Sequence, residues 1–206
     1  MIIIVNFKTY KQGKDVLKFA KKIEKTGKKI IVGIQASDIE EVAKKTKLRV
    51  YAQHADSAFP GRNTGFIVPE SVKAEGAEGT FLNHSEHRLK SDILKKTIKR
   101  CKQIGLRTAV FASDIDEARK IEKLHPNILI VEPPELVGGK ISVSSAKPEL
   151  IKEISKKLRM KFLVGAGIHN REDVRVAMKL GASGIAVSSS VMTSKNPEKV
   201  LKELMG

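Results

Sequence analysis

The chain has little of several residue types, and each shortage excludes a class of protein. Its 206 residues include a single cysteine, Cys101, and no tryptophan. One cysteine excludes an intrachain disulfide framework and a cluster of thiolate metal ligands. No apolar run approaches the roughly 20 residues that span a bilayer. The apolar start, 1–5, lacks a basic leader and a cleavage site, which favours a buried strand over a signal peptide. We therefore expect one cytoplasmic domain over 1–206, with no membrane partner.

Acidic residues are also scarce relative to basic ones. Lysine and arginine number 39 against 23 aspartates and glutamates, which gives a net charge of +16. A nucleic acid is one partner that such a charge could attract. However, the lysines recur at helical spacing, and only two tyrosines are available to stack on bases. We expect lysine-coated outer helices, whose field attracts small phosphorylated anions, and no nucleic-acid partner.

Short β-branched runs alternate with helical patterns from end to end. The predicted strands are 2–6, 29–34, 48–53, 79–83, 107–111, 128–132, 161–165 and 184–188. The predicted helices that follow them are 14–26, 38–46, 69–75, 90–104, 114–123, 147–159, 171–180 and 196–204. Asp38, Asp114 and Asn196 stand where helix caps are expected. Eight such units without a change in composition predict an α/β fold, a closed parallel (β/α)8 barrel. A doubly wound open sheet is the alternative.

Three predicted strand ends carry polar side chains suited to proton transfer. Glu132 ends an apolar strand and is followed by two prolines and then a glycine pair, a pattern that suits a base beneath a lid. Asn6 and Lys8 follow the first strand, and His84 follows the fourth. Singly, each could be a solvated or structural residue. Because barrel active sites lie where strands end, the set predicts a catalytic site.

The last two units predict a phosphate site. Residues 165–168, Gly-Ala-Gly-Ile, precede a helix that begins near Asn170, and 188–190 are three serines. Glycines let backbone N–H groups approach an anion closely, and such barrels often bind phosphate after strands seven and eight. Glycines that serve only tight turns are the alternative.

Together these motifs resemble the triosephosphate isomerase family, in its compact archaeal form, over essentially the whole chain. The motifs that carry the resemblance are Val5–Tyr10, Ala52–Asp56, Leu82–Arg88, Val131–Gly138, Val164–Ile168 and Gly181–Gly184. The resemblance implies a TIM barrel that interconverts dihydroxyacetone phosphate and D-glyceraldehyde 3-phosphate, in glycolysis and gluconeogenesis, without a metal or an organic cofactor.

The resemblance also implies a role for each matching residue. Glu132 would be the base, His84 the electrophile, and Lys8 the cation that Asn6 holds beside the substrate oxygens. Glu86 would be a buried carboxylate behind them. The phosphate would be bound by Val137, Gly138, Gly167, Ser188 and Ser189. The remaining histidines match no catalytic role and are interpreted as structural or surface residues: His54, His87, His125 and His169.

Segment 54–68 matches the loop through which the family dimerises. We therefore expect a homo-oligomer, a dimer or a tetramer, in which Thr64 approaches the Asn6–Lys8 region of another copy. The chain departs from the family pattern at His87, at Phe111, at Lys140 and in the serines of 188–190. Two other functions stay open on the residues alone. One is an inactive barrel that binds RNA, and the other is an epimerase, although this chain lacks the usual clusters of metal ligands or paired acids.

Overall fold

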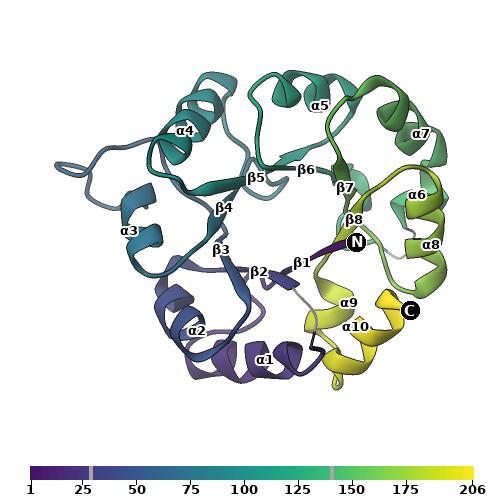
Figure 1. The fold of residues 1–206 in the computed structure, drawn as a ribbon, viewed down its shortest axis with the longest axis horizontal. Helices are drawn as coiled ribbons and strands as arrows, with labels where there is room; N and C mark the ends of the chain where they lie inside the picture. Colours follow the sequence, from purple (N-terminus) through teal and green to yellow (C-terminus); the bar gives the residue numbers. More distant parts are fainter. Residues whose placement is uncertain (28–29, 140–141) are drawn as a thin grey trace.

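A computed structural model describes residues 1–27, 30–139 and 142–206. Parallel strands follow one another in chain order around a closed barrel, β1-β2-β3-β4-β5-β6-β7-β8, with helices outside it (Figure 1). The strands are β1 Ile2–Asn6, β2 Ile30–Ile34, β3 Arg49–Ala52, β4 Gly79–Leu82, β5 Arg107–Ala112, β6 Ile128–Val131, β7 Phe162–Val164 and β8 Gly184–Val187. The prediction of a closed barrel is confirmed, and an open sheet is excluded because β1 pairs with β8. Of the predicted strand 29–34, residue 29 lies outside the described residues.

The helices form a ring around the strands (Figure 1). Their bounds are α1 Lys14–Glu24, α2 Ile39–Lys45, α3 Pro69–Ala74, α4 Ser91–Gln103, α5 Ile115–Glu122, α6 Val143–Ala146, α7 Pro148–Lys157, α8 Arg171–Lys179, α9 Ser189–Met192 and α10 Pro197–Met205. Two 3-10 turns, η1 Ala36–Asp38 and η2 Pro134–Leu136, complete the set. None of the described helices is long and apolar enough to cross a membrane.

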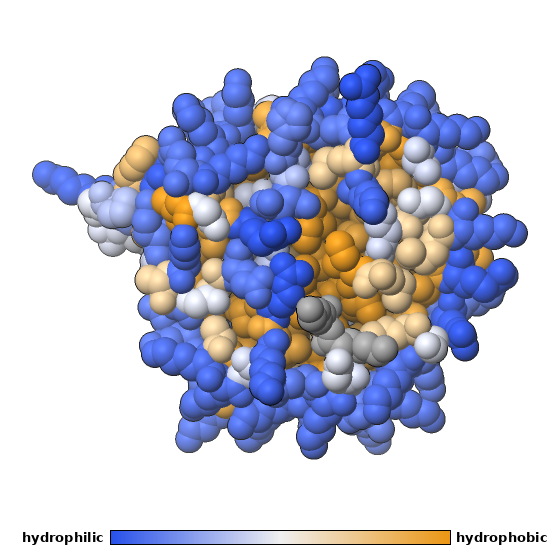
Figure 2. Space-filling model, in the orientation of Figure 1, coloured by the Kyte–Doolittle hydropathy of each residue, from blue (hydrophilic) through white to orange (hydrophobic). Residues whose placement is uncertain are grey.

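Two apolar clusters hold the fold together. The smaller fills the barrel interior with side chains from alternating strand positions, among them Ile4, Tyr51, Phe81 and Phe111. The larger packs the outer strand faces against the helices. Figure 2 shows hydrophilic side chains around the rim of the molecule and more apolar residues towards its middle. This distribution agrees with the predicted lysine-coated helices.

The single cysteine of the chain lies in the larger apolar cluster. Cys101 is fully buried on α4, and its burial raises the pKa of the thiol to about 12. A thiol with that pKa is protonated at neutral pH and is a poor nucleophile. Cys101 is therefore a residue of the core.

Two of the three predicted helix caps are confirmed. The side chain of Asp114 accepts a hydrogen bond from the Glu117 N–H, and that of Asn196 accepts one from the Lys199 N–H. Asp38 makes no such bond, so its prediction was wrong. The reason is that Asp38 is the last residue of η1, which runs directly into α2. Its backbone is already helical and does not have the extended conformation of a cap.

Candidate active site

The first strand end presents a lysine through a tight turn. The side-chain oxygen of Asn6 accepts a hydrogen bond from the Lys8 N–H at 3.0 Å, and Lys8 has a φ of 45°. The Gln53 amide donates to the Lys8 carbonyl at 2.9 Å and to the Gly33 carbonyl at 3.1 Å. Gln53 therefore ties the ends of β1, β2 and β3 together. The sequence pattern does not indicate this role for Gln53, because its partners are far away along the chain.

The second strand end presents an imidazole with a fixed proton. Nδ1 of His84 accepts a hydrogen bond from the Glu86 N–H at 3.1 Å. In the neutral ring, the proton therefore lies on Nε2. Nε2 is 3.0 Å from Oε2 of Glu132, and the Phe111 ring packs edge-on against the imidazole at 4.7 Å between centroids. Residues 84–87 form a turn, and α4 begins only at Ser91.

The third strand end presents a nearly buried carboxylate. The side chain of Glu132 is 10% exposed, and its Oε2 makes no hydrogen bond although the His84 ring lies beside it. Its backbone N–H donates to the Ala112 carbonyl at 2.8 Å, which continues the pairing with β5. A buried carboxylate oxygen without a hydrogen bond is free to accept a proton from a bound molecule.

Space for this carboxylate comes from Gly165. A Cβ at position 165 would lie 2.5 Å from Oε1 of Glu132 and 3.4 Å from its Cβ. No side chain larger than hydrogen fits there without moving Glu132. The sequence indicated Gly165 only as part of a phosphate loop, and the structure shows that it also positions the carboxylate.

A polar network behind His84 fixes its loop. Asn83, at a φ of 62°, donates to the Phe111 carbonyl at 2.9 Å and to Glu117 at 3.0 Å. Arg88 donates to the Asn83 carbonyl and to the same Glu117 carboxylate. Burial alone would raise the pKa of Glu117, but hydrogen bonds from Arg88, Ser113 and Asn83 hold the pKa below its usual value. Glu117 is thus an anion that anchors both sides of the His84 turn, a role the sequence did not indicate.

Glu86 differs from its predicted environment. Its Oε1 lies 2.7 Å from the Lys8 ammonium, but its side chain is 56% exposed. The expectation of a buried carboxylate is wrong for the single chain. The turn that aligns the His84 ring brings the Glu86 backbone inward and leaves the carboxylate facing solvent.

All of the predicted catalytic and phosphate-binding residues line one small cavity. Its walls include Asn6, Lys8, His84, Glu132, Val137, Gly138, Gly167, Ser188 and Ser189. The cavity holds about 40 Å³, and two larger openings, of about 380 and 440 Å³, share Lys8 with it. Val137 and Gly138 belong to segment 133–139, called the lid below, and form part of its wall.

One of the serines has a structural task. The Ser188 hydroxyl donates to the Asn6 carbonyl at 2.8 Å, so it joins β8 to β1 at the cavity floor. Ala166 and Gly167 both have positive φ, at 72° and 65°. The Ala166 carbonyl accepts the Val143 N–H at 3.1 Å, which joins the start of α6 to the β7 loop. The predicted Lys140 departure lies outside the described residues.

The remaining histidines lie at three different places. His54 stacks on His87 at 4.2 Å between centroids and lies 3.2 Å from Asp56, and burial lowers the pKa of His54. His125 is exposed at the opposite, amino-terminal end of β6. His169 contacts the lid and is considered below.

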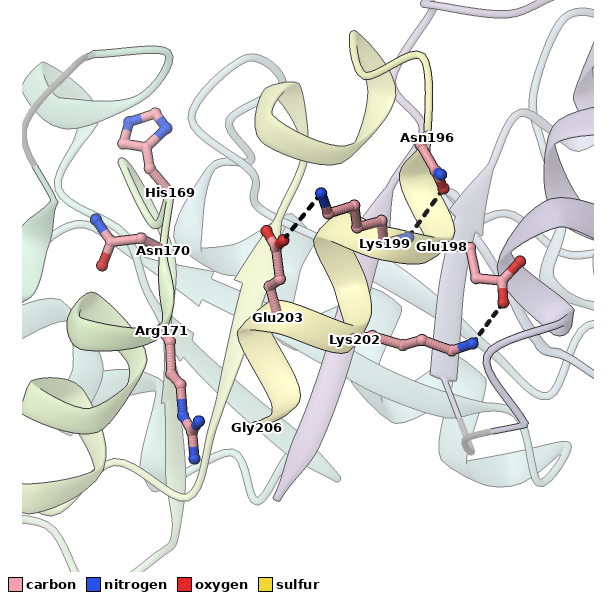
Figure 3. Close-up of a pocket in the computed structure, with 9 residues that line it drawn as sticks. All are labelled: His169, Asn170, Arg171, Asn196, Glu198, Lys199, Lys202, Glu203 and Gly206. Carbon is pink, nitrogen blue, oxygen red and sulfur yellow. Dashed lines mark hydrogen bonds and ion pairs between the residues drawn. The ribbon is translucent and has the colours of Figure 1, made fainter.

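A second cavity is larger than the one that Glu132 lines. It has a volume of about 830 Å³ and lies between the start of α8 and α10 (Figure 3). Its ammonium groups already have partners, because Lys202 pairs with Glu198 at 2.6 Å and Lys199 with Glu203 at 3.9 Å. No group of three metal-ligating side chains occurs among residues 1–27, 30–139 and 142–206.

Comparison with known proteins gives one family. The family model described as triosephosphate isomerase matches residues 1–204. Proteins named triosephosphate isomerase from Saccharolobus solfataricus and Metallosphaera sedula are 42% and 41% identical, over 99% of this chain and 94% of each relative. One from Methanocaldococcus jannaschii is 39% identical over the whole chain and 99% of the relative.

Proposed function

This chain belongs to the triosephosphate isomerase family, and we propose that its barrel end interconverts dihydroxyacetone phosphate and D-glyceraldehyde 3-phosphate with Glu132 as the base. The observation that carries the proposal is the Oε2 of Glu132, which is buried, makes no hydrogen bond and lies 3.0 Å from Nε2 of His84. The reaction is a step of glycolysis and of gluconeogenesis.

Glu132 removes a proton from the carbon next to the substrate carbonyl and returns it to the neighbouring carbon. In water a carboxylate is a weak base for such a proton. In a nearly buried site it is not weakened by a hydration shell, and the lid keeps water out during the transfer. Gly165 supports this role because it leaves room for the carboxylate next to the cavity.

His84 and Lys8 stabilise the negative charge that develops on the substrate oxygens. Because Nδ1 of His84 accepts the Glu86 N–H, the neutral ring offers its Nε2 proton to the cavity. Lys8 adds a full positive charge, and Asn6 and Gln53 hold its backbone in place. Fixed donors of this kind stabilise a transition state without reorganising during the reaction. The Glu117 network supplies the rigid support for His84.

A coupled assay with D-glyceraldehyde 3-phosphate tests the function directly. The purified chain should isomerise the substrate without added metal or cofactor. A chain that lacks activity but binds RNA in a salt-dependent way would instead support the inactive, basic barrel.

Val137, Gly138, Gly167, Ser188 and Ser189 form the phosphate site in this proposal. Support comes from their common cavity, although they belong to three different βα units. A phosphorylated carboxylate such as 2-phosphoglycolate should therefore slow amide exchange across the lid, 133–139. It should also stabilise the fold by about 2.7 kcal/mol at about 100 times its dissociation constant. An analogue that bound the lysine-rich outer helices and left lid exchange unchanged would contradict this assignment.

We also infer that two copies assemble through segment 54–68, and that the enzyme works in the cytoplasm. The segment projects beyond the helix ring next to α3 (Figure 1), and its Phe59 and Phe66 rings are 63% and 55% exposed. A cavity of about 380 Å³ beside the active site offers a receptor for the tip of the segment, with Lys8, Glu86 and His87 in its lining. A partner's Thr64 inserted there would cover the exposed Glu86.

Replacing Phe59 with aspartate should lower both assembly and activity, because a charge would replace the apolar tip. The substitution should leave the single chain folded, since Phe59 is exposed and packs on Arg100, with which an aspartate can pair. Light scattering measures the mass, and Phe59→Leu, which keeps the apolar surface, is the control. A wild-type monomer with full activity would refute the role of the segment.

A further inference from the structure

His169 contacts the lid through its ring. Its Nε2 lies 3.0 Å from the Gly139 carbonyl oxygen. Since a carbonyl can only accept, the ring must donate its Nε2 proton in this contact. The bond crosses from the β7–α8 unit to the end of the lid, which belongs to the β6 unit. His169 also lines the catalytic cavity next to Gly167 and Ile168.

The base of the His169 side chain is held rigidly. Its backbone N–H donates to the Asp173 carboxylate at 2.9 Å, which also accepts the Asn170 N–H and completes a capping box at the start of α8. Asp173 is buried, and its carbonyl accepts the Ser144 hydroxyl at 3.0 Å. Asp173 therefore contacts both α6, which follows the lid in the chain, and the backbone of His169, whose ring contacts Gly139.

Among the described residues, no hydrogen bond or ion pair joins the ring of His169 to the side chains of the large cavity beside it. Figure 3 shows it apart from the charged side chains of α10, where the drawn interactions pair lysines with glutamates and with Asn196. His169 is exposed, so its ring N–H donates either to the Gly139 carbonyl or to water. Its donor is available to the lid whenever the lid lies over the cavity.

We propose that His169 is a lid latch, a positioning residue whose imidazole N–H holds the Gly139 carbonyl and so keeps the closed lid against the phosphate loop. This inference rests on the proposed isomerase function. The latch does not touch the reacting atoms. It lengthens the time that the lid remains closed over the enediolate.

A chemical side reaction reports on this closure. In an exposed enediolate, the oxyanion electron pair on the first carbon re-forms a carbonyl and the double bond shifts towards the third carbon. The bond from that carbon to the phosphate oxygen then breaks, and inorganic phosphate leaves with the bonding pair. The step needs no oxidant or reductant. A closed lid suppresses this loss of phosphate, because the site then holds the phosphate group in place and excludes water.

The experiment compares His169→Ala with His169→Gln, whose amide N–H reaches about as far as Nε2. His125→Asn is the remote control, because it removes an exposed imidazole at the other end of the barrel and asparagine tolerates a positive φ of 51°. One neutral hydrogen bond corresponds to roughly a 3- to 10-fold effect. In His169→Ala we expect the ratio of phosphate released to triose isomerised to rise by about that factor. We also expect kcat/KM for the phosphorylated triose to fall, with no change for glyceraldehyde, whose lack of phosphate leaves the lid open.

His169→Gln should restore both values, and amide exchange across 133–139 in the presence of 2-phosphoglycolate should be faster only in His169→Ala. An unchanged phosphate ratio and unchanged exchange in His169→Ala would overturn the latch while leaving the isomerase assignment intact. Equal losses with phosphorylated triose and glyceraldehyde would also overturn it, since they would show a general structural defect. A wild-type chain without isomerase activity would instead refute the proposed function, and lid exchange would still test the contact.

Discussion

Replacing Glu132 with aspartate is expected to lower kcat about 100-fold and leave the barrel folded. The substitution keeps the charge but withdraws the carboxylate by one methylene. A misplacement of about 1 Å in a reacting group can reduce the rate by roughly 10²-fold. The site offers little compensation, because Gly165 packs on one carboxylate oxygen and His84 on the other. Steady-state kinetics with D-glyceraldehyde 3-phosphate measure the loss.

Glu149→Asp is the matched control for this variant. It makes the same change in the first turn of α7, where the exposed Glu149 side chain pairs with Lys152. We expect nearly unchanged turnover from it. If Glu132→Asp kept the wild-type kcat, Glu132 would not be the base.

Replacing Lys8 with methionine is expected to lower kcat/KM by about 100-fold or more, with losses in both substrate binding and turnover. Methionine keeps most of the stem packing and tolerates the backbone about as well as lysine. In the proposed mechanism the ammonium faces the phosphorylated substrate in the ground state and the enediolate in the transition state. Its loss should therefore raise KM and lower kcat. Removing one fixed donor to such an oxyanion typically reduces kcat by about 10²- to 10³-fold.

Two further variants separate the charge from its ion pair. Glu86→Gln removes the partner that lies 2.7 Å from the Lys8 ammonium, and this exposed pair should contribute little to stability. Lys14→Met makes the same change on the exposed start of α1 and should leave activity unchanged. Normal KM and turnover in Lys8→Met would return Lys8 to a solvated surface role.

Local patterns were enough to predict the architecture. Alternating apolar runs and helical stripes gave all the strands within one or two residues at each end, and the order of the units predicted the closed barrel. The meeting of Lys8, His84 and Glu132 at one cavity was predictable because the ends of parallel strands lie on one face of a barrel. The sequence did not indicate α6 and α9, since four residues carry too little periodicity to register as helices.

The residues that position the site could not be predicted from local sequence patterns. Gln53, Glu117 and Gly165 act through contacts with residues that are distant in the chain. The residues next to Gln53 in the sequence do not show whether its side chain bonds to neighbouring strands or to solvent. The exposure of Glu86 was mispredicted because the role was transferred from the family, and the residues around Glu86 in the sequence do not report its burial.

The pairing of β1 with β8 has a consequence for how the protein is made. Ile2 pairs with Gly184. Only glycine fits at position 184, because a Cβ there would lie 2.1 Å from the Ile2 carbonyl oxygen. At a synthesis rate of about 5–20 residues per second, β8 is made on the order of 10–40 s after β1. During that interval both outer strands of the incomplete sheet present unpaired backbone to other nascent chains. A chain shortened so that it lacks β8 would keep both open edges permanently.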